Sequence, residues 1–357
     1  PRSLMLKTLK LAALRCAKST GVFRTSAGGR WRQRRLLILC YHGISLDDEH
    51  KWNPRLYMPP GLFEQRLALL HKNGCNVLPL DEAILRMYDG TLPPMSVTIT
   101  FDDGFHDFYA KAYPLLRRYG YLATVYLTTS YCGRNSPVFN PACYYLLWKA
   151  RGRVLDGCNF GISSMLDLTT PDGIDRARLA LTSFVTSHSL DGNAKSRLLL
   201  DLCGSIGIDY TELTRNRLLQ LMSPAEIREL ASAGVNFQLH THRHRAPASR
   251  DLFFREIQEN RKHILDLTGR NPVHLCYPSN EYRLDFLPWL VQLSVSTATT
   301  CDAGLASQRS NTLLLPRLVD HCGLSNIEFE SWLYGCAEFL PKRKVAARVS
   351  YTRSGTT

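Results

Sequence analysis

The sequence predicts an α/β protein, a distorted (β/α)7-type barrel with a helical insertion. Short runs of aliphatic and β-branched residues alternate with segments that carry apolar residues at helical spacing. The chain length of 357 residues is normal for one α/β barrel. Polar side chains able to bind a metal follow directly on several of the strand-like runs, where barrels of this class place their chemistry.

Strands and helices are expected to alternate along the chain, with six or seven strands in all. The strand-like runs are residues 36–41, 96–101, 121–129, 235–239, 273–277, 294–300 and 313–319. The helical patterns between them are residues 61–73, 81–88, 107–119, 224–233, 249–268, 284–293 and 326–334. Asp81 and Ser325 are expected N-caps, and Ser223 with Glu226 forms a capping box.

Residues 131–222 differ from the rest because they carry helical patterns and no convincing strand. The patterns lie at residues 142–150, 174–187, 194–202 and 211–221. We therefore expect three parts in the chain, namely a basic N-terminal segment, a barrel domain that contains the helical insertion, and a basic C-terminal tail. Their bounds are 1–35, 36–335 with the insertion 131–222, and 336–357.

The net charge of +13 belongs to the two ends of the chain. Residues 1–35 hold ten Lys/Arg and residues 341–357 hold five, without an acid in either, which leaves 29 basic against 31 acidic residues elsewhere. Basic ends are usually solvated and can also contact an anionic membrane surface. The near-neutral body disfavours nucleic acid, and no apolar run approaches the ~20 residues of a membrane span.

The eleven cysteines indicate a reducing compartment. Their number is odd, no CxxC pair occurs, and Cys40 and Cys276 lie inside apolar strand-like runs. We expect reduced, buried thiols and a cytoplasmic protein, with the inner face of the membrane as the alternative placement.

Two short segments carry the chemistry. Asp102 and Asp103 end one strand-like run, and His240, His242 and His244 follow another. One carboxylate and two imidazoles can hold a divalent metal with positions open for water and substrate, and a second carboxylate can act as general base. Extended backbone would place all three histidines on one face, whereas a helical turn would pair only the first with the third.

Together the two segments resemble the polysaccharide deacetylase family, the carbohydrate esterases with the NodB homology domain. Thr100-Phe101-Asp102-Asp103-Gly104 matches the family's first motif, and His240-Thr241-x-x-His244 matches its His-Ser/Thr-x-x-His motif. The likeness covers roughly residues 36–335. Tyr41-His42-Gly43-Ile44 and Leu315-Pro316-Arg317 are also similar to a bacterial subgroup associated with cell-surface glycan synthesis.

The resemblance implies roles for individual residues. Asp103, His240 and His244 match the metal ligands, and Asp102 matches the catalytic base, with Thr241 supporting the histidine motif. The implied cofactor is a divalent metal, with zinc expected and cobalt, nickel, manganese or iron as alternatives.

The later motifs match less closely. Leu275–Asn280 stands where the family has its third motif, so Tyr277, Pro278 and Ser279 are expected to contact substrate, and Cys276 replaces the usual arginine. Arg317 is expected to contact substrate and to supply the missing charge near Asp102. His321 is the candidate general acid, and His42 is a second candidate.

The implied activity is hydrolysis of N-acetyl groups, or less readily O-acetyl groups, on a polysaccharide or glycan precursor. Two alternatives stay open at this point: a catalytically inactive glycan-binding protein on the same fold, and a hydrolase of another non-peptide amide or of an ester.

Overall fold

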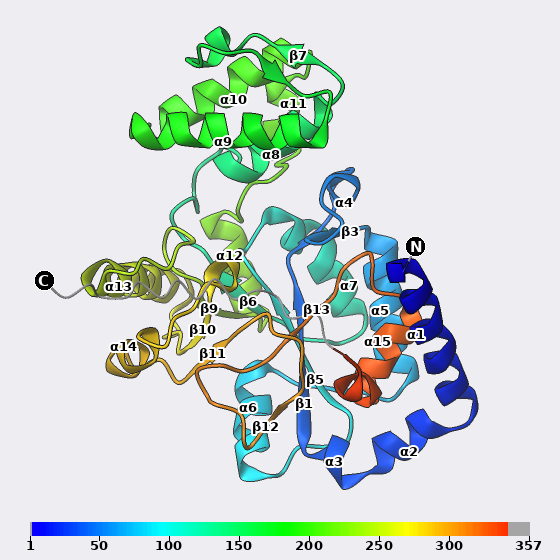
Figure 1. Cartoon of the computed structure of the whole chain (residues 1–357). Helices are drawn as coiled ribbons and strands as arrows, with labels where there is room; N and C mark the ends of the chain where they lie inside the picture. Colours follow the sequence, from blue (N-terminus) through cyan, green and yellow to red (C-terminus); the bar gives the residue numbers. More distant parts are fainter. Residues whose placement is uncertain (1, 342–357) are drawn as a thin grey trace, which may run out of the picture.

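A parallel sheet curls through the centre of the molecule, surrounded by helices (Figure 1). The computed structural model describes residues 2–341. The strands that pair in parallel are β1 (Arg35–Tyr41), β5 (Ser96–Phe101), β6 (Thr124–Leu127), β9 (Asn236–Leu239), β10 (His274–Cys276), β11 (Thr297–Thr299) and β13 (Leu318–Val319). Their order across the sheet is β11-β10-β9-β6-β5-β1, and β13 pairs with β1. Six of them lie within the predicted strand runs, and β1 begins one residue before its run.

The segment around β13 connects the two edges of this sheet. Leu315 makes a parallel bridge to Thr299 of β11, and β13 pairs in parallel with Leu39 and Cys40 of β1. Seven strand segments therefore follow one another around a curled sheet, and the predicted distorted (β/α)7-type barrel is confirmed. Two short strands extend its lower rim, namely β4 (Asn76–Val77) beside β5 and β12 (Ala306–Ser307) antiparallel to β1.

Helices cover the outside of the sheet at the places that the periodicity predicted. They are α5 (Pro60–Lys72), α6 (Leu80–Asp89), η1 (Phe108–Ala112) with α7 (Tyr113–Arg118), α12 (Pro224–Ser232), α13 (Arg250–Thr268), α14 (Phe286–Gln292) and α15 (Asn326–Leu333). The capping box of Ser223 and Glu226 is present, and Ser325 forms another with Glu328. The N-cap predicted at Asp81 is wrong, because α6 begins at Leu80 and the Asp81 carboxylate instead pairs with His274 at 2.7 Å.

The N-terminal basic segment is helical and packs against the barrel. It forms α1 (Arg2–Ser19), α2 (Val22–Gly28) and α3 (Arg30–Gln33). Lys10 and Lys18 of α1 pair with Glu328 and Glu330 of α15, and the buried Arg32 donates to the Leu333 carbonyl. Part of the positive charge of this end is thus neutralised by the barrel. Residues 342–357, which include most of the predicted C-terminal tail, lie outside the described residues.

The insertion forms a separate lobe above the barrel mouth (Figure 1). Its helices are α8 (Phe139–Lys149), α9 (Pro171–Ser187), α10 (Gly192–Ile206) and α11 (Tyr210–Arg215). They share a core of their own, in which Leu146, Leu181 and Leu202 are fully buried. The structure adds a small antiparallel pair of strands that the sequence pattern did not indicate, β7 (Val154–Leu155) and β8 (Leu166–Asp167). The short helix η2 (Gly157–Phe160) lies in the connection between them.

Three short elements frame the mouth from the barrel side: β2 (Gly43–Ile44), α4 (Glu49–Trp52) and β3 (Tyr57–Met58). Across residues 2–341, the helices include none whose length and hydropathy would let it cross a membrane.

Candidate active site

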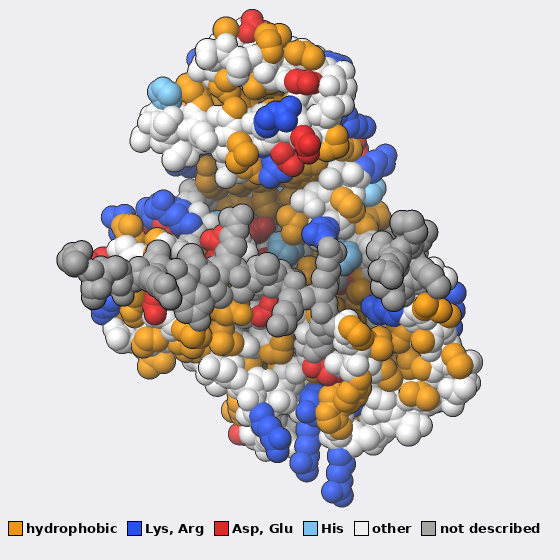
Figure 2. Space-filling model, in the orientation of Figure 1, with side chains coloured by type: hydrophobic (Ala, Val, Ile, Leu, Met, Phe, Trp, Pro, Cys, Tyr) orange, Lys and Arg blue, Asp and Glu red, His pale blue; other side chains and the backbone are white. Residues whose placement is uncertain are grey.

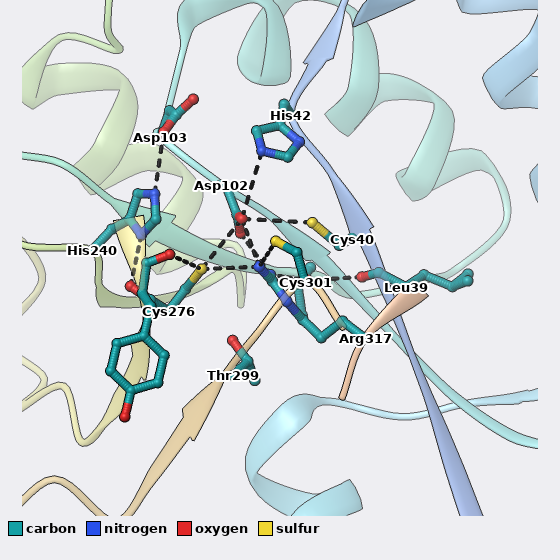
Figure 3. Close-up of polar contacts among 12 residues, drawn as sticks. Leu39, Cys40, His42, Asp102, Asp103, His240, Cys276, Thr299, Cys301 and Arg317 are labelled. Carbon is teal, nitrogen blue, oxygen red and sulfur yellow. Dashed lines mark hydrogen bonds and ion pairs between the residues drawn. The ribbon is translucent and has the colours of Figure 1, made fainter. Parts of the chain in front are cut away.

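The turn after β5 sends two adjacent carboxylates in different directions. All six residues of β5 are buried, and the Asp102 backbone N–H continues the ladder by donating to the Tyr41 carbonyl. The backbone then turns through positive φ at Asp103 (71°) and Gly104 (86°). Glycine suits the second position because a Cβ there would lie 2.3 Å from Cδ1 of Leu127. Asp102 consequently points into the barrel, whereas Asp103 faces its mouth (Figure 3).

His240 and His244 converge on Asp103. Their Nε2 atoms lie 3.2 and 3.1 Å from Oδ1 of Asp103, and their rings meet edge to face at 4.9 Å. The backbone of Thr241 (φ 62°) and His244 (φ 53°) is neither extended nor helical. This turn pairs the first histidine with the third. Thr241 supports it, because its hydroxyl accepts the Arg245 N–H at 3.0 Å.

His242 points away from the cluster. Its Nδ1 lies 2.8 Å from the Thr129 hydroxyl, its Nε2 lies 3.8 Å from Glu259, and its ring stacks on His263. The side chains are thus arranged as expected for a helical turn, with His240 beside His244 and His242 apart, although the backbone of this segment is not helical.

The residues at the mouth fit a divalent metal. Asp103, His240 and His244 offer two imidazole nitrogens and a carboxylate oxygen that all lie within 4.8 Å of one another. The Nδ1 of His240 lies 2.9 Å from the Cys276 carbonyl, which places its proton there and leaves Nε2 able to act as a ligand. Oδ1 of Asp103 is buried and accepts no hydrogen bond from the described residues. A cation at this position would satisfy that oxygen.

The charges of this group agree with a cation site. Burial acts to raise the pKa of Asp103, but His244 and His240 hold it well below its usual value. Burial likewise acts to lower the pKa of His244, and Asp103 raises it above its usual value. Each partner thus stabilises the charged form of the other, and this attraction is what a bound metal would replace.

Asp102 lies deeper, in a buried ion pair with Arg317 (Figure 3). Nη1 and Nη2 of Arg317 donate to the two carboxylate oxygens, each at 2.7 Å. The thiols of Cys276 and Cys40 lie 3.3 and 3.5 Å from Oδ2. Burial acts to raise the pKa of Asp102, but the charge and hydrogen bonds of Arg317 hold it well below its usual value. Asp102 is therefore a carboxylate at neutral pH.

The prediction that Arg317 contacts substrate is wrong. Its side chain is 0% exposed, and its remaining donors bind the Thr300 carbonyl and the Thr100 hydroxyl. The same contacts agree with the other expectation for this residue, that it brings positive charge to Asp102.

The third-motif segment contributes one exposed side chain. Tyr277 is buried and donates its hydroxyl to the Leu313 carbonyl, and Pro278 is also buried, so neither side chain is placed to bind substrate as predicted. Ser279 is exposed at the barrel mouth, where its backbone adopts φ 55°. The Tyr277 N–H donates to the Thr299 carbonyl and proline has no N–H, so the Ser279 N–H is the amide donor left in this turn.

The predicted general acid His321 does not reach the cluster. Asp320 at the end of β13 turns inward to Arg66, and His321 turns away, where its Nδ1 accepts the Gly323 N–H at 3.0 Å. The structure places His42 near the carboxylates instead, with Nε2 3.8 Å from Oδ2 of Asp102. Burial lowers the pKa of His42.

Sequence reasoning missed two residues of α13 that hold the histidine segment. Asn260 is fully buried, accepts the His240 N–H at 2.9 Å and donates to the Leu127 carbonyl. Glu256 is buried one turn earlier and accepts hydrogen bonds from Arg243 and Arg245. The sequence pattern that could have indicated them is a pair of polar residues at i,i+4 spacing on the otherwise apolar face of a long helix.

A cavity of about 700 Å³ lies between the barrel mouth and the insertion (Figure 2). Asp103, His244 and Ser279 border it from the barrel. The insertion contributes residues that the sequence did not single out: Tyr131, Arg134, Phe139, Asn140, Tyr144, Thr182, Val185 and Lys195. The volume is that of a small-molecule site.

Comparison with known proteins gives consistent results. The family model for polysaccharide deacetylase matches residues 89–161 and 170–298, more than half of the chain. The putative polysaccharide deacetylase YxkH of Bacillus subtilis (strain 168) is 39% identical over 94 residues, which are 26% of this chain and 32% of that protein. The chain thus matches about a third of the length of this curated relative.

Among solved structures, the Streptococcus pyogenes deacetylase PplD in complex with acetate has a TM-score of 0.55 at 20% identity and covers 86% of this chain and 99% of its own. IcaB from Ammonifex degensii has a TM-score of 0.51 at 15% identity, covering 84% and 97%. The de-N-acetylase from Aggregatibacter actinomycetemcomitans has a TM-score of 0.51 at 16% identity, covering 84% and 99%. At these identities the likeness establishes a shared fold.

Proposed function

The chain belongs to the polysaccharide deacetylase family, and we propose that it is a metal-dependent hydrolase that removes N-acetyl groups from a polysaccharide or glycan precursor. The observation that carries the proposal is the convergence of Asp103, His240 and His244 on one point at the barrel mouth, beside the buried carboxylate of Asp102. We take residues 36–335 as the catalytic domain and residues 131–222 as its insertion.

Asp103, His240 and His244 would hold the metal, and we propose zinc because two imidazoles and one carboxylate are a common donor set for it. Cobalt, nickel, manganese and iron are the alternatives. When bound, such an ion lowers the pKa of water and polarises a carbonyl oxygen.

The chain's own residues supply the rest of the reaction. Asp102 is ionised at neutral pH and accepts the proton that water loses as its oxygen bonds to the acetyl carbon. The Ser279 N–H donates to the carbonyl oxygen as negative charge develops on it. The C–N bond then breaks, the nitrogen takes up a proton, and the products are acetate and a free amino sugar.

We assign the proton delivered to the leaving nitrogen to His42. Its Nε2 lies 3.8 Å from Oδ2 of Asp102, and 17% of its side chain is exposed. A proton taken up by Asp102 can pass to His42 across this short separation. His321 lacks this position, so changing it to alanine should leave turnover intact, whereas His42→Asn should lower kcat more than it changes KM.

The proposal is tested by measuring acetate and free amine released from N-acetylated oligosaccharides. Asp102→Asn should abolish release while the protein keeps its metal, because the base is lost and the three ligands remain. His242→Ala is the matched control, since this histidine faces Thr129 and Glu259. Full activity of Asp102→Asn would refute the assignment of the base.

We propose that the protein works in a reducing compartment, in the cytoplasm or at the inner face of the membrane. All eleven cysteines are unpaired, and three of them, Cys40, Cys276 and Cys301, lie around the Asp102–Arg317 pair. Alkylation of the native protein taken directly from cells should find free thiols, and paired disulfides would contradict this placement.

A further inference from the structure

We propose that Arg134 and Lys195 of the helical insertion form a subsite for an oxyanion, a phosphate or carboxylate carried by the substrate sugar. This inference rests on the proposed function, because it assigns the substrate class of the same site. It also gives the insertion a role, that of the wall that selects anionic substrates.

The two cations and the reacting centre border one cavity. Asp103 and His244 line it from the barrel, and Arg134 and Lys195 line it from the insertion. A volume of about 700 Å³ accommodates a sugar with a charged substituent. A substrate whose acetyl group lies at Asp103 can therefore carry a second group toward the insertion.

The cations of the insertion are the ones whose charge is not neutralised. Arg243 and Arg245 on the barrel wall pair with Glu256 at 3.1 and 2.8 Å. Within residues 2–341, neither Arg134 nor Lys195 has a carboxylate within 4.0 Å, and Asp103 is the one acidic residue that lines the cavity. A metal at Asp103 would offset that charge, so the cavity favours a negatively charged ligand.

The position of Arg134 depends on a glycine. Its guanidinium lies against Gly192 at the start of α10, where a Cβ would be 1.8 Å from Nη1 and 3.0 Å from Cζ. Tyr131 supports the guanidinium from the other side, with its ring centroid 5.5 Å from Cζ.

Lys195 follows Gly192 by three positions, so it lies on the same face of α10 one turn away. Both cations thus lie at the N-terminal end of α10 and line the same cavity. The nearby Asp191 caps α10 by accepting the Ala194 N–H at 2.8 Å. A planar guanidinium with an ammonium beside it is a suitable pair for a phosphate or carboxylate.

The test compares matched substrates and variants. Acetate release is measured on methyl N-acetylglucosaminide, which is neutral, on N-acetylglucosamine 1-phosphate and on N-acetylmuramic acid, which carries a carboxylate. For the native protein, KM for at least one anionic sugar should be about 10-fold or more below that for the neutral sugar, because one hydrogen bond to a charged group contributes that much. The two anionic sugars separate a phosphate source from a carboxylate source.

The variants Arg134→Gln, Lys195→Gln and their combination should reduce this ratio toward 1. Arg197→Gln is the control, since it removes the same charge from an exposed position on α10 that does not line the cavity. It should leave the ratio unchanged. Thermal unfolding of each variant verifies that the fold is intact.

Equal KM values for neutral and anionic sugars in the native protein would overturn the inference, as would an equal effect of Arg197→Gln. Calorimetric binding of N-acetylglucosamine 1-phosphate to the native protein separates the two proposals. Acetate release with equal KM for neutral and anionic sugars refutes the subsite and leaves the proposed activity standing. Binding that is lost in the double variant, with no acetate from these sugars or from N-acetylated oligosaccharides, supports the subsite and refutes the proposed activity.

Discussion

Replacing Arg317 with methionine should destabilise the protein strongly, because it leaves the Asp102 carboxylate buried without its counter-charge. The two side chains are 0% and 2% exposed and share two hydrogen bonds of 2.7 Å. Breaking such a buried pair by removing one partner lowers the free energy of unfolding by about 3–5 kcal/mol. The exposed pair of Arg118 and Glu64 has the same 2.7 Å separation with side chains 60% and 44% exposed. Arg118→Met should therefore cost about 1 kcal/mol or less.

The difference between native and Arg317→Met should depend on pH in a defined direction. In the native protein the pKa of Asp102 is depressed, so its contribution to stability is present above the unfolded value of about 3.9 and is lost as pH falls toward the folded pKa. Without Arg317, burial is the largest influence left on Asp102, opposed by the nearby His42 and His240, so its pKa should rise above the unfolded value. At lower pH, protonation of Asp102 removes the unpaired buried charge from the variant. The loss of stability should therefore be larger at pH 8 than at pH 5.

Urea unfolding at pH 5 and pH 8 measures these free energies of unfolding. It is applied to the native protein, to Arg317→Met, to Asp102→Asn and to the double substitution. The double variant should recover part of the loss, since no buried charge remains. A loss below about 1 kcal/mol, or the same loss at pH 5 and pH 8, would refute the reasoning that Arg317 neutralises a buried carboxylate.

Two further changes test how the site is supported. Asn260→Ala removes the side chain that accepts the His240 N–H and should weaken metal binding about 10- to 100-fold, as loss of supporting hydrogen bonds around metal sites does; unchanged affinity in a metal titration would show that β9 alone orients His240. Gly43→Ala would place a Cβ 2.2 Å from the Tyr57 ring and 2.7 Å from Oδ2 of Asp107, so the free energy of unfolding should fall by about 1–3 kcal/mol. A melting temperature equal to that of the native protein would contradict this packing.

The sequence predicted the barrel well because strand runs and helical faces are local patterns. The Ser223 capping box and all seven strand runs needed only neighbouring residues to be recognised. Asp81 failed as a cap because α6 begins at Leu80, directly after Pro79, while His274 from a distant strand takes the Asp81 carboxylate. The docking of α1 on α15 also escaped prediction, since its ion pairs join residues more than 300 positions apart.

The sequence indicated which residues would form the site, but it did not indicate where every side chain would point. The motif residues Asp103, His240 and His244 meet as the resemblance implied. The directions of these side chains, however, depend on partners distant in the sequence, which no residue pattern determines here. Arg317 therefore turns inward to a carboxylate 215 positions away, and His321 turns outward.

The cavity wall was the least predictable part. The helical pattern of residues 131–222 indicated a lobe, but its placement over the barrel depends on packing between distant segments. Tyr131, Arg134 and Lys195 are ordinary surface residues in sequence, and only the folded chain brings them to the same cavity as Asp103.

The most direct measurement is metal stoichiometry and acetate release on the same protein samples, titrated with zinc after the metal has been removed. In the native protein and in His242→Ala, activity should rise in parallel with the binding of one ion per chain. His240→Ala should neither hold the ion nor release acetate. Acetate release by the metal-free native protein, or retention of a stoichiometric ion by His240→Ala, would contradict the central claim that Asp103, His240 and His244 form the catalytic metal site.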